Sequence, residues 1–156
     1  MIRSVRSRWR VALAAALTLV TVGCTPSTSI TRDEAEERLQ EHATAAADVL
    51  PDELELDTTR RINAPPCDTS EDQIWVSQSF WLDGLPVEDN EANVDALVRH
   101  WEDNGYEITT DERPQKLRVG ASHSEDGFEL RVRTSVQGDL SLRVSSPCIW
   151  PGGSRW

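Results

Sequence analysis

Two stretches of the chain carry apolar residues at the three- and four-residue spacing of an amphipathic helix. The first begins at Thr31, where a hydroxyl followed three residues later by Glu34 forms a capping-box signature. Its stripe is narrow and rich in alanine, ends at Pro51, and consists of Ala35, Leu39, Ala43, Ala46, Val49 and Leu50. The second helix ends near Gly105, and its apolar face holds Val94, Leu97, Val98 and Trp101.

Elsewhere apolar and polar residues alternate, as they do in strands with one buried face. The strongest alternation runs from Gln73 to Leu82, and a weaker one at 54–62 predicts a short edge strand or an extended connection. Alternating runs also follow the second helix, at 106–110, 117–121, 128–136 and 140–144. The run at 117–121 either continues or restarts the one before it. These elements predict an α+β fold, with an antiparallel sheet of about four strands and both amphipathic helices packed on one face.

The first 23 residues have the pattern of an export signal. Four arginines precede an uncharged run, Val11 to Val22, which as a helix spans about 18 Å and is too short for the roughly 30 Å core of a bilayer. Gly23 and Cys24 then resemble the lipobox of bacterial lipoproteins, in which the cysteine takes diacylglycerol and becomes the new N-terminus. Thr21 departs from the leucine usual in that motif. The alternative is an ordinary secretory signal with a chance cysteine nearby.

A lipid on Cys24 would anchor the protein at the outer face of the cytoplasmic membrane. Such a cysteine carries at least two acyl chains, and each buried CH₂ contributes roughly 0.8 kcal/mol. Residues 24–30 would form a short tether, whose six residues after the cysteine span about 20 Å when extended. A single α+β domain is then expected over 31–149, followed by a C-terminal tail over 150–156.

The charge balance narrows the classes of partner. The export signal contains four of the 16 basic residues and none of the 27 acidic ones, so the mature part has 12 against 27 and a formal charge of −15. A domain this acidic repels nucleic acid, anionic lipid headgroups and anionic wall polymers. We therefore expect no nucleic-acid partner, and we expect the lipid alone to hold the domain at the membrane.

Cys67 and Cys148 are expected to form a disulfide. They are the pair that remains once Cys24 is lipidated, and in an oxidising compartment a bridge is the default. The bridge would close a loop of about 80 residues and stabilise the fold by roughly 4 kcal/mol in the chain-entropy model. One cysteine precedes the first strong strand and the other follows the last. The bridge therefore forms most easily if those strands are antiparallel neighbours.

Four features together carry a resemblance to a known group of proteins. They are the lipobox, Pro66-Cys67 before a tryptophan-containing strand, the second helix with its Val-x-x-Leu-Val-x-x-Trp pattern, and the closing Ser146-Pro147-Cys148. In this the chain resembles small uncharacterised lipoproteins of actinobacteria. The resemblance covers the mature chain loosely and its motifs are structural, so it implies a surface location without an activity.

A basic and aromatic surface is expected on the side of the sheet away from the helices. If the apolar strand faces point inward, the outward positions hold Trp75, Trp81, Arg118, Arg131, Arg133 and Arg143, with Glu129 among them. Arginine over tryptophan gives cation–π contacts worth about 0.5–2 kcal/mol. Such a face could bind a partner protein, a carbohydrate or an anionic wall fragment. The competing interpretation is that arginine stems, or the tail over 149–156, cover the indoles.

No spacing typical of a catalytic or metal site is evident. His42, His100 and His123 are far apart, residues 123–126 resemble a solvated hairpin turn, and the common hydrolase, metalloprotease and phosphate-loop motifs are absent. The sequence predicts no cofactor, no metal and no enzymatic activity. The leading hypothesis is a lipid-anchored extracytoplasmic accessory protein that binds an envelope protein or a wall-derived ligand. The alternatives are an envelope-structural or immunity-type protein without a soluble ligand and, less favoured, a small hydrolase.

Overall fold

A computed structural model describes residues 30–51, 54–57 and 61–154. The export signal and Cys24 lie outside these residues. The helices are α1 (Arg32–Ala47), the short η1 (Val87–Asp89) and α2 (Asn90–Asp103). The strands are β1 (Glu55–Asp57), β2 (Pro66–Cys67), β3 (Ser70–Ile74), β4 (Ser77–Asp83), β5 (Tyr106–Asp111), β6 (Arg118–His123), β7 (Glu129–Thr134) and β8 (Leu140–Ser145).

The larger sheet has six strands in the order β1-β4-β8-β7-β6-β5, and every neighbouring pair is antiparallel. The α+β class and the antiparallel sheet are therefore confirmed, but the expected count of about four strands is too low. The weak alternation at 54–62 contains a real edge strand, β1, which pairs with β4. At the other edge β5 and β6 pair as a hairpin, so the run at 117–121 restarts rather than continues the strand before it.

The single strand predicted from Gln73 to Leu82 is wrong in extent. β3 ends at Ile74 and pairs with β2 in a separate hairpin, whereas β4 begins at Ser77 in the large sheet. Trp75 lies between them and donates its backbone N–H to Pro65 at 3.2 Å. Alternation continues through this join because Val76 is still buried. A periodicity argument therefore cannot detect that the backbone changes partners there.

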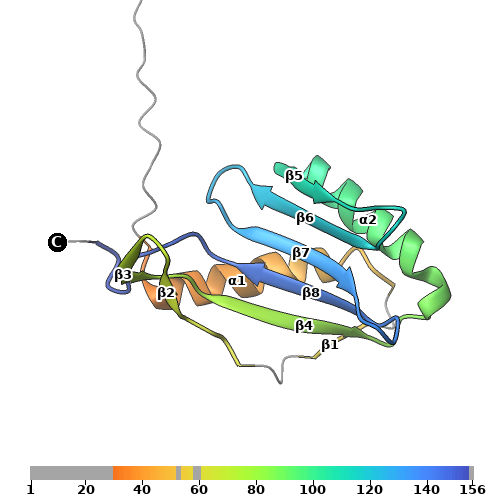
Figure 1. The fold of residues 1–156 in the computed structure, drawn as a ribbon, viewed down its shortest axis with the longest axis horizontal. Helices are drawn as coiled ribbons and strands as arrows, with labels where there is room; N and C mark the ends of the chain where they lie inside the picture. The colour runs from red at the N-terminus through yellow and green to blue at the C-terminus, as the bar shows by residue number, and fades with distance from the viewer. Residues whose placement is uncertain (1–29, 52–53, 58–60, 155–156) are drawn as a thin grey trace, which may run out of the picture.

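Both helices pack against the same side of the large sheet, α1 over β4 and β8 and α2 over β5 and β6 (Figure 1). The capping box at the start of α1 forms as predicted, with Glu34 accepting from the Thr31 backbone at 2.7 Å. The helix ends at Ala47, so Val49 is 37% exposed rather than part of the buried stripe. Trp101, Phe80 and Phe128 are the largest fully buried side chains between the two layers. No helix in the described part of the chain is long and apolar enough to cross a bilayer.

The predicted disulfide joins Cys67 and Cys148, whose Cα atoms are 6.1 Å apart. The two strands it brackets, β4 and β8, are antiparallel neighbours, as the positions of the cysteines suggested. Ile149, just beyond the bridge, is buried and pairs with Ile74. Gly152 then pairs with Thr31, so the first residues of the tail attach to the start of α1.

Candidate functional site

The strand register brings the predicted arginines together on the side of the sheet opposite the helices. Along β7 and β8 the buried positions alternate with outward ones, as the sequence pattern required. Arg131 lies directly opposite Arg143, and Arg133 lies directly opposite Arg118. Like charges facing each other on neighbouring strands destabilise a sheet. The repulsion between these facing charges therefore acts against the stability of the sheet.

Arg143 is held in place by two of its neighbours. Its guanidinium lies over the Trp75 ring, 5.0 Å from the centroid, and its Nη2 donates to the Ser77 hydroxyl at 3.3 Å. Partial burial lowers the pKa of Arg143, and the nearby charges of Arg131 and Arg133 lower it further. A cation whose pKa is depressed in this way would be stabilised by an anion placed beside it.

Most of these arginines have no acidic partner among the residues that the structure describes. Arg118 pairs with Glu112 at 3.0 Å, and this ion pair neutralises it at the edge of the face. Within residues 30–51, 54–57 and 61–154, no ion pair joins Arg131, Arg133 or Arg143 to a carboxylate. Three of the four predicted arginines thus share an exposed surface without a counter-charge from the described chain.

Two of the unpaired arginines, Arg131 and Arg143, border a hollow of about 470 Å³. Trp75, Arg143 and Pro147 contribute to its wall, and Gly120 lies beside it across from Arg131. A Cβ at Gly120 would come within 3.3 Å of the Thr109 hydroxyl, so a side chain there would crowd this side of the hollow. The volume falls within the roughly 300–1,000 Å³ typical of small-ligand sites.

A second, smaller hollow of about 90 Å³ adjoins the first. Trp81 and Arg133 line it, and Arg131 and Arg143 line both hollows. We call the surface formed by Trp75, Trp81, Arg131, Arg133 and Arg143 the arginine face. Its two tryptophans occupy different hollows, so each can contact a different part of a ligand that spans the arginines.

The competing interpretation of this surface holds only in part. Arg143 does cover one side of Trp75, but both tryptophans remain partly exposed. The described tail residues, 149–154, line neither hollow. Sequence reasoning missed the contributions of Gly120 and Pro147. A glycine inside a strand can mark a close approach of other groups, but the sequence does not say which groups approach.

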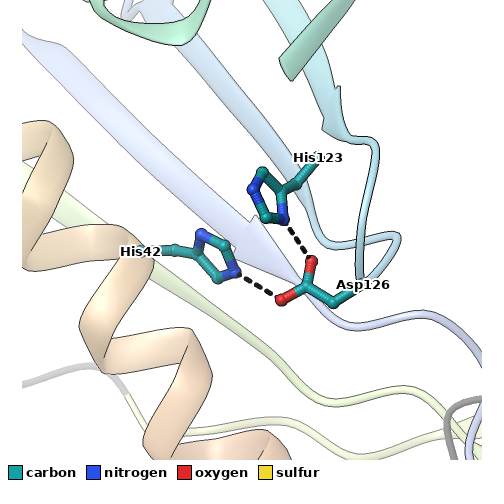
Figure 2. A group of neighbouring side chains, drawn as sticks. All are labelled: His42, His123 and Asp126. Carbon is teal, nitrogen blue, oxygen red and sulfur yellow. Dashed lines mark hydrogen bonds and ion pairs between the residues drawn. The ribbon is translucent and has the colours of Figure 1, made fainter. Parts of the chain in front are cut away.

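A second polar cluster lies where α1 meets the turn between β6 and β7 (Figure 2). Asp126 is 3.1 Å from Nε2 of His42 and 2.7 Å from Nδ1 of His123. The Tyr106 hydroxyl is 2.5 Å from the other ring nitrogen of His42. The expectation of a solvated turn at 123–126 is wrong for its two end residues, because the side chains of His123 and Asp126 are only 17% and 13% exposed.

Burial shapes the protonation of this cluster. It lowers the pKa of His42, although the hydrogen bond to Asp126 acts in the opposite direction. Burial also acts to raise the pKa of Asp126, but hydrogen bonds from His123, the Phe128 backbone and His42 outweigh it and leave the pKa below its usual value. The pKa of Tyr106 rises to about 12, first through burial and then through the charge of Asp126. At neutral pH the cluster therefore holds a carboxylate, a neutral phenol and a neutral His42.

Comparison with protein-family models, with curated proteins and with solved structures finds no match to this chain. Functional inference therefore depends on the arginine face and the histidine cluster themselves.

Proposed function

We propose that the protein is a lipid-anchored extracytoplasmic binding protein whose arginine face binds a small, anionic, wall-derived sugar. One observation carries the proposal: Arg131 and Arg143 border two adjoining hollows, the larger lined also by Trp75 and the smaller by Arg133, and none of the three arginines has a carboxylate partner in the described chain. Guanidinium groups match the planar geometry of carboxylates and phosphates, and hydrogen bonds to charged groups contribute about 1.5–3 kcal/mol each.

The tryptophans make a sugar-bearing ligand more suitable than a bare anion. Trp75 and Trp81 present partly exposed indole surface beside the guanidinium groups. An amphipathic ligand can lay the apolar side of a ring on an indole and direct its anionic group toward the arginines. Apolar walls with a few placed charges are the usual composition of a small-molecule site.

The overall charge of the domain limits how long the ligand can be. The mature part carries a formal charge of −15, which repels an extended polyanion at long range. At physiological ionic strength this repulsion is screened beyond about 8 Å, so at the two adjoining hollows the charges of the three arginines dominate. A short ligand with one or two anionic groups suits these conditions better than nucleic acid or a long anionic polymer.

The proposed extracytoplasmic location depends on the N-terminal export signal and on the roles of the three cysteines. Cys24 follows a short apolar run and a small residue, as in the lipobox it resembles. The disulfide between Cys67 and Cys148 suits an oxidising compartment. A protein held there meets fragments of the cell wall, which is why a wall-derived ligand is preferred to a metabolite of the cytoplasm.

The test is a calorimetric titration of the full lipidated protein in detergent micelles. The probes are an amino-sugar disaccharide that carries a carboxylate, the methyl ester of the same disaccharide, and inorganic phosphate. We expect wild type to bind the acid at least tenfold more tightly than the ester. The double variant Arg131→Gln/Arg143→Gln should weaken binding of the acid tenfold or more, because two charge-assisted hydrogen bonds are lost.

Arg99→Gln is the matched control, since Arg99 lies exposed on α2, away from the arginine face. It should leave the affinity for the acid unchanged. Equal binding of the acid by the folded double variant and by wild type would refute the proposal. Failure of wild type to bind either anion would refute it too, and would favour the envelope-structural role.

A further inference from the structure

The geometry points to a second site, in which His42, His123 and Asp126 bind a divalent transition-metal ion of the zinc class. One donor atom from each residue lies within 4.8 Å of the other two. The three side chains converge from α1, from the end of β6 and from the following turn (Figure 2). This site is separate from the arginine face and does not depend on the function proposed for it.

The donor set has the chemistry of a three-ligand zinc site. Two imidazoles and one carboxylate suit zinc and related ions, which in such sites keep a fourth position for water or a ligand. Tetrahedral coordination with bonds of about 2.0–2.2 Å places ligand atoms about 3.3–3.6 Å apart. Nε2 of His42 lies 3.1 Å from one carboxylate oxygen of Asp126, and Nδ1 of His123 lies 2.7 Å from the other. Because one donor atom from each residue lies within 4.8 Å of the other two, every donor pair needs to shift by no more than about 1.5 Å to reach the tetrahedral spacing.

The turn that carries two of the ligands is fixed by its backbone. Gly127 donates to the His123 carbonyl at 2.9 Å, and Ser124 donates to the Gly105 carbonyl at 3.0 Å. Phe128 donates its N–H to the Asp126 carboxylate at 3.2 Å, which orients that side chain toward α1. The positions of His123 and Asp126 are therefore set before any ion arrives, and this reduces the entropy lost on binding.

The surroundings of His42 also fit a metal ligand. A ligating histidine usually makes a hydrogen bond through its other ring nitrogen, and here Nδ1 of His42 is 2.5 Å from the Tyr106 hydroxyl. The Phe128 ring lies against the imidazole, with centroids 4.9 Å apart, and closes one side of the site. His42 therefore has a defined orientation that leaves Nε2 directed at Asp126.

Two features of the cluster act against metal binding. The guanidinium of Arg38 lies 3.9 Å from Asp126, and its positive charge would repel a cation. The cluster can also satisfy itself without metal, if Tyr106 donates to His42 and both histidines donate to Asp126. In that arrangement it would only tie α1 to the β6–β7 turn. If zinc binds, one cation takes the place of the two N–H donors that point at Asp126. A measurement of zinc binding therefore distinguishes a metal site from a hydrogen-bonded cluster without metal.

The experiment is calorimetry of the full lipidated protein in detergent micelles with zinc chloride as the only titrant. We expect saturation at one ion per chain. His42→Gln and His123→Gln should each lower the affinity at least tenfold, and Tyr106→Phe should lower it about 10–100-fold through the orientation of His42. Arg38→Gln should raise the affinity, because it removes a positive charge beside Asp126.

His100→Gln is the matched control, because His100 lies on α2 outside the cluster, and it should bind zinc as wild type does. Cobalt(II) provides a second readout, since wild type should give the visible absorption bands of a tetrahedral ion and His123→Gln should not. Absence of saturable zinc binding by wild type would overturn the proposal. So would unchanged affinity in both histidine variants, which would assign the ion to the acidic surface instead.

Discussion

At single positions in this protein, residues far away in the sequence restrict which side chain can be accommodated. Gly138 shows this in the turn between β7 and β8. It has φ +96°, and its carbonyl accepts from the side chain of Asn90 at 2.6 Å. An added Cβ would lie 3.0 Å from a methyl group of Val87. The position therefore excludes side chains for two independent reasons, backbone conformation and the packing of η1 against the turn.

Gly138→Ala is expected to destabilise the protein by about 1–2 kcal/mol from the left-handed conformation alone, with a further loss from the contact with Val87. Gly152→Ala is the matched control, since a Cβ there meets nothing within 4 Å and the residue lacks a positive φ. Urea unfolding followed by circular dichroism would measure both variants. Equal unfolding midpoints for Gly138→Ala and wild type would contradict the strain assigned to this turn.

At the scale of elements, side chains in loops connect layers that backbone hydrogen bonds do not join. Arg113, between β5 and β6, pairs with Asp111 at 2.6 Å and also with Asp95 on α2. Hydrogen bonds from the Arg113 side chain and backbone lower the pKa of Asp111 to about 2. The arginine thus holds the β5–β6 hairpin against the helix that covers it, and the strength of this connection depends on the ionisation of Asp111.

The sign of the pH effect follows from the lowered pKa. A carboxyl whose pKa is lower in the folded state stabilises the protein above its unfolded pKa, and this stabilisation is lost as the pH falls through the folded value. We therefore expect wild type to lose stability between about pH 4 and pH 2 through Asp111. Arg113→Gln should lose less over that range. The difference should stay within about 1 kcal/mol, because the pair is partly exposed and screened by solvent.

Thermal unfolding at pH 5 and pH 3 would measure this effect, with Arg99→Gln as a control for the loss of an arginine from the surface. An acid-induced drop of equal size in Arg113→Gln and wild type would contradict the coupling.

At the scale of the whole molecule, the two ends of the described chain meet at one end of the sheet. Thr31 pairs with Gly152, and the disulfide and the Ile74–Ile149 pair lie just before it in the chain. Pro147 and Trp75 neighbour these residues in sequence and line the larger hollow. If Cys24 carries the lipid, a tether of about 20 Å leads from the membrane to Thr31. Under our proposal the Trp75 end of the arginine face is therefore the end nearer the membrane.

The lipid anchor is tested by Cys24→Ala. We expect this variant to incorporate no labelled palmitate and to leave the membrane fraction, because the acyl chains are the only membrane attachment that the proposal assigns. Cys148→Ser is the matched control, since it removes a cysteine from the disulfide and should keep the label. Labelled fatty acid on Cys24→Ala, or a wild type that lacks fatty acid altogether, would refute the anchor and the address inferred from it.

The local elements were predictable because their signals are local. The capping box of Thr31 and Glu34 and the stripe from Ala35 to Ala46 depend on residues three and four positions apart. The outward direction of Arg131, Arg133 and Arg143 follows from strand alternation alone. Even the pairing of β4 with β8 followed from the two cysteines, because a bridge requires short distances between the chain segments that it joins.

Tertiary structure alone decided which of these side chains meet. The sequence by itself determined the helices, the strand faces and the composition of the arginine face, since each depends on the periodicity of one segment. It could not determine that Arg131 opposes Arg143, that Gly120 lies beside their hollow, or that His42 reaches Asp126 across 84 positions of chain. Those contacts depend on strand register and helix packing, which are set by burial of the whole core at once and leave no spacing in the sequence.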